Sequence, residues 1–208
     1  MSSYQVQTQS FELAGSLWHI RSLLDGNQYS DPEGAAAACG ISEEGWSHFG
    51  RIWPAGQVLA EVVGRPDAKH RRMLEIGCGL ALAGLVAHRA LADITVSDLH
   101  PLAETFLLHN LALNGLPPLA YRTVDWSRPP LALGRFETLI GSDILYEPQQ
   151  AAQLADFVLR HATEDAEIIV VDPGRGHRGH FSRLLQAQGF ACAITASGRT
   201  QVLHYQRP

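Results

Sequence analysis

The stretch MLEIGCGLALAG, residues 73–84, decides the fold of this 208-residue chain. An apolar run ends in the triplet Gly77-Cys78-Gly79, and small and apolar residues follow the triplet. A short apolar run is typical of a buried strand, and glycine lets the backbone approach a ligand with no Cβ in the way. The stretch therefore predicts a strand, a glycine turn and a helix, an arrangement that binds nucleotides.

Strand-like and helical patterns alternate from residue 73 to residue 188. The predicted strands cover residues 73–77, 93–98, 119–125, 138–144 and 167–172, and the predicted helices cover residues 80–90, 102–113, 148–161 and 181–188. The strand runs are continuously apolar, as in parallel sheets that are covered on both faces. Residues 191–196 and 201–206 flank Ser197-Gly198 and predict a final antiparallel hairpin. We expect an α/β, Rossmann-like sheet that is mostly parallel and ends in this hairpin.

The first seventy residues show a different pattern. Residues 5–13 and 16–24 flank Ala14-Gly15 and predict a small hairpin, and residues 25–34 have the composition of a loop. Trp53-Pro54 then opens a predicted helix over residues 55–63, because proline suits the first helical turn. We expect residues 1–50 to form an N-terminal extension packed on the core, and residues 51–208 to form one domain.

Composition and charge exclude several classes of protein. The formal net charge is −5, which argues against a general DNA or RNA binder. The three cysteines are widely spaced with no CxxC pair, which favours a reducing compartment. The polar N-terminus lacks the apolar core of a signal peptide, and no run is long enough to span a bilayer. We therefore expect a soluble cytoplasmic protein without nucleic-acid or membrane partners, present as a monomer.

The glycine turn carries two features that distinguish between nucleotide ligands. A dinucleotide site follows the pattern G-x-G-x-x-G/A, but Leu82 stands at the final small position. Glu75 lies just before the glycines, where an acid repels a pyrophosphate and can accept hydrogen bonds from an ammonium group. These features favour a ligand with a cationic end and no phosphate, and S-adenosylmethionine has an amino-acid tail and a sulfonium.

Further anchors follow at the ends of the next two predicted strands. Asp98 lies about 20 residues beyond the first glycine of the turn, where a carboxylate grips a ribose diol. Asp125-Trp126 ends the third strand, where an acid can bind an adenine edge and an indole can stack on the base. Taken singly, Asp98 could cap a helix that begins near Pro101, and Trp126 could be a core residue. Together they predict a ligand site along one edge of the sheet.

With these anchors, the sequence resembles the class I, seven-β-strand S-adenosylmethionine-dependent methyltransferases. Within that class it resembles the methyltransferase-like protein lysine methyltransferases and their bacterial relatives, among them predicted nicotinamide N-methyltransferases. The resemblance runs from about residue 50 to about residue 176. Its motifs are Trp53-Pro54-Ala55, LEIGCGLALAG, VSDLHPLAE, NLALNG, VDW, GSDILYE and VDPGRG.

The resemblance implies S-adenosylmethionine as cofactor and S-adenosylhomocysteine as product. The implied cofactor-binding residues are Trp53 beside the methionine end, Glu75, Gly77 and Gly79 at the amino-acid end, Asp98 at the ribose, and Asp125 and Trp126 at the adenine. The family often has a third glycine where this chain has Ala81. A backbone torsion that needs a positive φ at this position is therefore in doubt.

The resemblance also implies a methyl-transfer site at Asp143 and Tyr146, which match the family's D-x-x-Y element after the fourth strand. A lysine amine must lose its proton before it attacks a methyl group. Asp143 could orient this amine or receive its proton, and Tyr146 could hydrogen-bond it or form one wall of a cation–π cage. The alternative is that Asp143 caps a turn and Tyr146 packs in the core. The element lacks the two prolines of DNA adenine methyltransferases.

We therefore expect a methyltransferase that acts on a nitrogen of a protein side chain, with lysine favoured. One alternative is a small-molecule N-methyltransferase for a nicotinamide-like amine, and another is a non-catalytic module that binds S-adenosylmethionine. His177 and His180 have HxxH spacing without an evident third ligand, so we predict no metal site. Arg175, in the same loop, either contacts an acidic substrate or pairs with a nearby carboxylate.

Overall fold

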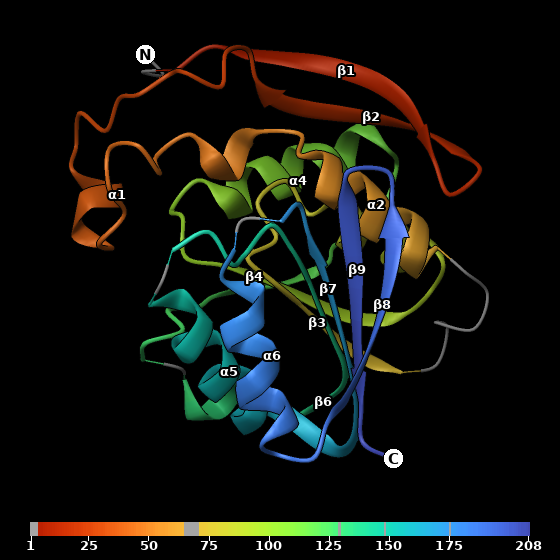
Figure 1. Ribbon diagram of the computed structural model, residues 1–208. Helices are drawn as coiled ribbons and strands as arrows, with labels where there is room; N and C mark the ends of the chain where they lie inside the picture. The colour runs from red at the N-terminus through yellow and green to blue at the C-terminus, as the bar shows by residue number, and fades with distance from the viewer. Residues whose placement is uncertain (1–3, 65–70, 129, 148, 175) are drawn as a thin grey trace.

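A seven-stranded sheet forms the centre of the computed structural model, which describes residues 4–64, 71–128, 130–147, 149–174 and 176–208. The strand order is β5-β4-β3-β6-β7-β9-β8 (Figure 1). The strands are β3 (Arg72–Ile76), β4 (Asp93–Asp98), β5 (Ala120–Thr123), β6 (Phe136–Ser142), β7 (Ala162–Asp172), β8 (Ala191–Ser197) and β9 (Thr200–Gln206). The first five pair in parallel, and β9 is antiparallel to both β7 and β8. The predicted fold class is confirmed.

Helices cover both faces of the sheet, which explains the continuous apolar strands. The helices are α1 (Ala35–Ala38), α2 (Pro54–Val63), α3 (Leu82–Arg89), α4 (Ala103–Leu113), α5 (Gln150–His161) and α6 (Arg178–Gln186). Buried side chains of α2, α3 and α4 form one apolar cluster, and those of α5 and α6 form a second. Successive residues of β3 divide between the clusters: Met73 belongs to the first and Leu74 to the second.

Several predicted boundaries were wrong by a few residues, each for a local reason. The helix after the glycine turn begins at Leu82 because Ala81 is left-handed, with φ 57°. The fourth predicted strand ends at Ser142, because Asp143 is also left-handed, with φ 53°. β7 begins at Ala162 and not at residue 167, since its first five residues are polar or small and give no apolar run. Residue 148, where α5 was predicted to begin, lies outside the described residues.

The N-terminal residues form the predicted hairpin, β1 (Val6–Leu13) and β2 (Ser16–Leu23), across the top of the molecule in Figure 1. Side-chain amides of α4 complete the free edge of β2. The His19 and Arg21 N–H groups donate to the Oδ1 atoms of Asn114 (2.9 Å) and Asn110 (2.8 Å). The Asn114 Nδ2 group donates to the His19 carbonyl at 2.7 Å. Two amides on successive turns of a helix thus take the place of a neighbouring strand.

The segment between this hairpin and α2 leads to the edge of the sheet where the strands end. It contains α1 and the 3₁₀ turn η1 (His48–Gly50). Trp46 and Phe49 are buried in the same apolar cluster as the side chains of α2–α4. The boundary at residues 50/51 stays a prediction. Within the described residues, no helix is long and apolar enough to cross a membrane.

Candidate functional site

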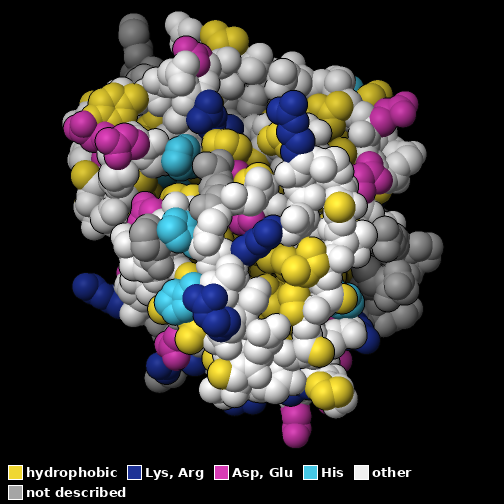
Figure 2. All heavy atoms as spheres, viewed as in Figure 1, with side chains coloured by type: hydrophobic (Ala, Val, Ile, Leu, Met, Phe, Trp, Pro, Cys, Tyr) yellow, Lys and Arg dark blue, Asp and Glu magenta, His cyan; other side chains and the backbone are white. Residues whose placement is uncertain are grey.

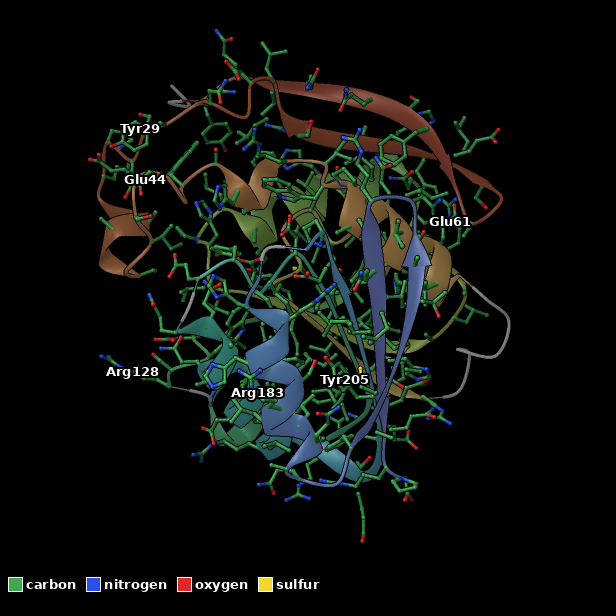
Figure 3. The ribbon with its side chains drawn as sticks, in the orientation of Figure 1. Tyr29, Glu44, Glu61, Arg128, Arg183 and Tyr205 are labelled. Atoms are coloured by element: carbon green, nitrogen blue, oxygen red, sulfur yellow. The ribbon has the colours of Figure 1, made fainter. Side chains whose placement is uncertain are left out.

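A cavity of about 920 Å³ lies at the carboxyl ends of β3, β4 and β6, the edge at which open α/β sheets bind ligands. Its opposite wall is the segment of residues 38–53, which we call the N-terminal wall. Glu44, from the N-terminal wall, and Arg128, from the loop after β5, both line the cavity and are labelled in Figure 3. The residues that the sequence analysis assigned to cofactor binding and methyl transfer line this one cavity: Trp53, Glu75, Gly77, Gly79, Asp98, Asp125, Trp126, Asp143 and Tyr146.

The glycine turn is shaped by left-handed backbone and by close neighbours. Gly77 and Gly79 have φ values of 61° and 51°. A Cβ at Gly77 would lie 2.9 Å from Cγ2 of Ile144, and one at Gly79 would lie 2.8 Å from the carbonyl oxygen of Phe49. Both positions therefore require glycine. Ala81, the departure from the family pattern, is also left-handed, and this conformation costs roughly 1–2 kcal/mol in an L-residue.

Glu75 is a buried acid beneath this turn, with 3% of its surface exposed. Its Oε2 atom accepts the Gly84 N–H of α3 at 2.8 Å. Burial raises the pKa of Glu75 to about 8, opposed by this hydrogen bond and reinforced by the charge of Asp98. The carboxyl is therefore protonated in much of the protein at neutral pH. A cation bound nearby would favour its ionised form.

Asp98 connects the end of β4 to the glycine turn. Its Oδ2 atom accepts the Gly79 N–H at 2.7 Å, and its Oδ1 atom accepts the His100 N–H at 2.8 Å. Burial raises the pKa of Asp98 despite these bonds. Asp98 does not cap α4, whose N-cap is Leu102 without a side-chain hydrogen bond. Each carboxylate oxygen has a second lone pair, so the group can still accept hydrogen bonds from a diol in the cavity.

Asp125 and Trp126 form the floor of the cavity beyond β5. Asp125 shapes its own turn, since its Oδ1 atom accepts the Ser127 N–H at 2.8 Å and the Ser127 hydroxyl at 2.6 Å. The half-buried Trp126 ring lies against the glycine turn: its Cζ2 atom is 3.3 Å from where a Cβ of Gly77 would lie. Part of the indole is therefore core, as the alternative interpretation supposed, and part lines the cavity.

Asp143 and Tyr146 lie in the turn after β6. Asp143 holds its left-handed conformation while its N–H donates to the Val171 carbonyl at 2.9 Å. Strained backbone of this kind is concentrated at functional sites. Tyr146 keeps 37% of its surface exposed, which is contrary to packing in the core. Partial burial of its hydroxyl raises the pKa of Tyr146, so the phenol stays protonated at neutral pH.

His48 joins this turn to the N-terminal wall, and our reading of the sequence missed it. Its ring makes edge-on contacts with the rings of Trp53 and Tyr146, each at 5.6 Å between centroids. The Trp53 Nε1–H donates to the His48 carbonyl at 2.9 Å. The Arg51 guanidinium lies over Trp53, 4.9 Å from the ring centroid. No spacing rule pointed to His48, since its contact with Tyr146 joins distant parts of the chain.

His100 is a second histidine of the cavity wall. Its ring stacks on Phe49 at 3.8 Å, and its Nδ1 atom accepts the Leu102 N–H at 3.2 Å. Burial lowers the pKa of His100 to about 4. Of the HxxH pair, His177 is the N-cap of α6 and its carbonyl accepts the His180 N–H. Residue 175 lies outside the described residues, so the two alternatives given for Arg175 stay predictions.

The two ends of the cavity differ in chemistry. One end has glycine backbone and the acids Glu75 and Asp98, which suit a polar ligand with a cationic group. The other end has the rings of His48, Trp53 and Tyr146 beside the carboxylate of Asp143, and aromatic faces attract cations. The arrangement can hold one ligand against the sheet and present it to a second group that enters between the rings.

Comparison with known proteins agrees with this geometry. A family model described as lysine methyltransferase matches residues 39–185. Histone-arginine methyltransferase METTL23 of Rattus norvegicus is 30% identical over 105 residues, which cover 47% of this chain and 47% of that relative. Protein N-lysine methyltransferase METTL21A of Danio rerio is 33% identical over 104 residues, which cover 46% of this chain and 47% of that relative. The chain spans about half the length of these curated relatives.

A solved structure shows the same fold over nearly the whole chain. It is the 16S rRNA N2 G1207 methyltransferase RsmC of T. thermophilus, in complex with AdoMet and guanosine. The TM-score is 0.69 and the identity 16%, over 98% of this chain and 51% of that chain. At this identity the likeness shows a shared architecture and carries no information about the acceptor.

Proposed function

The chain belongs to the lysine methyltransferase family, and from that membership we propose that it transfers a methyl group from S-adenosylmethionine to a nitrogen of a protein side chain, with lysine favoured. One observation carries the proposal: residues that the sequence assigns separately to cofactor and acceptor all line one cavity. S-adenosylhomocysteine is then the second product. Relatives that share about half of their length with this chain are named as lysine and arginine methyltransferases.

The cofactor end of the cavity fits S-adenosylmethionine. The backbone of Gly77 and Gly79 leaves a cradle that a Cβ would fill. We assign Glu75 to the cationic amino group, Asp98 to the ribose hydroxyls, and Asp125 with Trp126 to the adenine. When bound, the sulfonium supplies an activated methyl group, so the protein need not activate the electrophile.

The acceptor end has to align a neutral nitrogen behind the methyl group. Alignment alone can supply several kcal/mol of the barrier. We assign Asp143 to orient the nitrogen through a hydrogen bond, and Tyr146 and Trp53 to enclose the carbon chain that carries it. The fixed turn of Asp143 holds its carboxylate ready, because its N–H is bonded to the Val171 carbonyl of β7. Aromatic walls remove water from the amine and lower its pKa.

Exposure at the acceptor end supports a protein substrate over a small amine. A small-molecule enzyme encloses its acceptor, whereas a side chain of a protein needs an open entrance. Tyr146 keeps 37% of its surface exposed at this entrance. The net charge of −5 disfavours a nucleic-acid acceptor, and the face in Figure 2 shows Lys and Arg side chains as separate groups among other residues.

A labelled-methyl assay tests the proposal directly. The purified chain is incubated with methyl-labelled S-adenosylmethionine and, in parallel, with lysine-containing peptides, arginine-containing peptides and nicotinamide, and mass spectrometry locates the label. We expect label on lysine nitrogen. Label on arginine would keep the protein substrate and change the acceptor, and label on nicotinamide alone would overturn the protein substrate. If the chain binds the cofactor but transfers no label to any acceptor, including the proteins of a lysate, it is a non-catalytic module that binds S-adenosylmethionine.

A further inference from the structure

His48 lines the acceptor end of the cavity, although the assignments above give it no role. It begins the 3₁₀ turn η1 in the N-terminal wall. Its ring lies between Trp53, at the start of α2, and Tyr146, after β6. Its backbone carbonyl also fixes the Trp53 indole through a 2.9 Å hydrogen bond. His48 therefore joins the two pieces of chain between which an acceptor nitrogen would enter.

Methyl transfer to a protonated amine requires a group that accepts one proton from the nitrogen. A lysine amine is protonated at neutral pH, and its lone pair becomes available only after that proton is lost. The Tyr146 phenol stays protonated, because burial raises its pKa above the ordinary value, so it is no base at neutral pH. A carboxylate is ordinarily a much weaker base than an imidazole.

The two histidines that line the described cavity differ as bases. His100 is only 3% exposed, and its ring is covered by Phe49. The pKa of His100, about 4, makes it a poor base at neutral pH. The His48 ring is half-buried and lines the cavity beside Tyr146.

We propose that His48 is a further catalytic residue, the base that receives the proton of the acceptor nitrogen, while Asp143 orients that nitrogen. The inference rests on the proposed function. In the first step one N–H bond of the ammonium breaks, and a ring nitrogen of neutral His48 takes the proton. The freed lone pair then forms the N–C bond as the C–S bond breaks, and the sulfonium becomes a neutral thioether. His48 returns its proton to solvent through the exposed entrance.

The charged groups considered around His48 come from two segments of the chain. Glu44 and Arg51 of the N-terminal wall, and Asp143 and Glu147 of the turn after β6, line the same cavity. The acids favour the imidazolium, and the guanidinium and a bound sulfonium disfavour it. A sulfonium near His48 should therefore lower the pKa of this histidine, whereas the neutral thioether of S-adenosylhomocysteine should not.

The first test needs no acceptor. Proton NMR titration follows the His48 imidazole in the wild-type protein, assigned with His48→Gln, in the presence of S-adenosylmethionine and then of S-adenosylhomocysteine. We expect a lower pKa of His48 in the complex with the sulfonium. An equal pKa in both complexes would place His48 away from the transferred methyl and overturn the inference, with the proposed function intact. Failure of both ligands to bind would overturn both.

The second test separates a base from a packing residue. His48→Gln removes the titrating ring, and His48→Phe keeps an aromatic ring against Trp53 and Tyr146. Single-turnover methylation of a lysine-containing peptide that takes the label in the assay above is measured against pH. For both variants we expect a rate about 100-fold lower near pH 7, with the loss shrinking toward the pKa of the acceptor amine. The control His109→Gln, on α4 and outside the cavity lining, should keep the wild-type profile.

The affinity for S-adenosylhomocysteine completes the second test. Calorimetry should give values within about twofold of wild type for both variants, because His48 lies at the acceptor end and general acid–base groups act on the transition state. A His48→Phe variant with the wild-type rate and pH profile would reduce His48 to a packing residue. A uniform loss at every pH, with weaker cofactor binding, would have the same meaning.

Discussion

The Glu75 carboxyl contacts both the start of α3 and the cavity. It accepts one N–H of the first turn of α3, that of Gly84, and it lines the cavity beneath the glycine turn. Water is excluded from it, so the protonated form is favoured and the pKa of Glu75 is about 8. Its state therefore links the stability of the fold to pH.

We expect Glu75→Gln to flatten the dependence of stability on pH. The folded protein holds the Glu75 proton up to about pH 8, whereas the unfolded chain releases it near pH 4.5. The stabilisation is thus complete below pH 4.5 and is lost as the pH rises through 8. Relative to the variant, the wild type should lose roughly 2–4 kcal/mol of unfolding free energy between about pH 5 and pH 8.5, at about 1.4 kcal/mol per pKa unit.

Urea denaturation at a series of pH values measures this difference. Glu61→Gln is the matched control, since its carboxylate also accepts a backbone N–H, that of Ala14 at 2.7 Å, but at the surface. The control should keep the pH dependence of the wild type. Parallel curves for the wild type and Glu75→Gln would show that Glu75 ionises normally in the fold.

At the acceptor end we expect Asp143→Asn and Tyr146→Phe to lower single-turnover methyl transfer by about 10- to 100-fold, because misplacement of the nitrogen by a small distance is costly. Asparagine tolerates the left-handed backbone of Asp143, so the turn should survive. Affinity for S-adenosylhomocysteine should stay near wild type, a pattern that marks contacts made in the transition state. If His48 is the base, the Asp143→Asn loss should be the same at every pH. Equal losses of affinity and rate would show instead that these residues only build the pocket.

Four of the described helices, α1, α3, α4 and α6, end in the same motif, and one of the four lacks its usual glycine. α1, α4 and α6 end in Schellman turns with a glycine at the left-handed position: Gly40, Gly115 and Gly189. α3 ends in the same pair of hydrogen bonds, from Leu91 to the His88 carbonyl and from Ala92 to the Ala87 carbonyl. Its left-handed residue is leucine, with φ 66° and 86% of its surface exposed.

We therefore expect Leu91→Gly to stabilise the protein by up to about 1 kcal/mol. The left-handed conformation costs a leucine roughly 1–2 kcal/mol, and replacement by glycine removes this cost. Part of the stabilisation is lost again, because glycine raises the conformational entropy of the unfolded chain. Thermal unfolding of the variant measures the effect. Ala90→Gly, one residue earlier at φ −77°, is the control and should be destabilising. A destabilised Leu91→Gly would mean that the exposed side chain contributes packing.

Elements with a strong local signal were predictable from the sequence, and those held by distant contacts were not. β4 matches its predicted range because charged or polar residues bound an apolar run. The residues that we assign to the cofactor follow glycine and acid spacings along successive strands, so they could be placed at one edge of the sheet. η1 has no periodicity, and the position of His48 depends on Tyr146, nearly a hundred residues away. Ala81 and Asp143 adopt a left-handed backbone conformation that could not be predicted from their residue types alone.

At the scale of the whole molecule, cofactor binding should stabilise the fold. A ligand at about 100 times its Kd adds about 2.7 kcal/mol, which raises the Tm of a chain of this size by roughly 5–10 °C. We expect S-adenosylmethionine and S-adenosylhomocysteine to give such a shift and NADH to give none, since Leu82 and the acid beneath the turn oppose a pyrophosphate. Differential scanning fluorimetry measures it. A shift with NADH would contradict the assignment of the turn.

The asparagine that binds the N-terminal hairpin to α4 is open to slow chemical change during storage. Asn114 precedes Gly115, and an asparagine before glycine is prone to deamidation because no side chain hinders the cyclic intermediate. Its Nδ2 group donates to the carbonyls of His19 and Asn110. Deamidation would replace this NH2 group by a carboxylate oxygen, which cannot donate a hydrogen bond to either carbonyl oxygen. The deamidated protein should therefore bind β2 to α4 more weakly. Peptide mapping of stored protein beside hydrogen exchange of the His19 amide would follow both changes, and unchanged exchange in the deamidated fraction would contradict this.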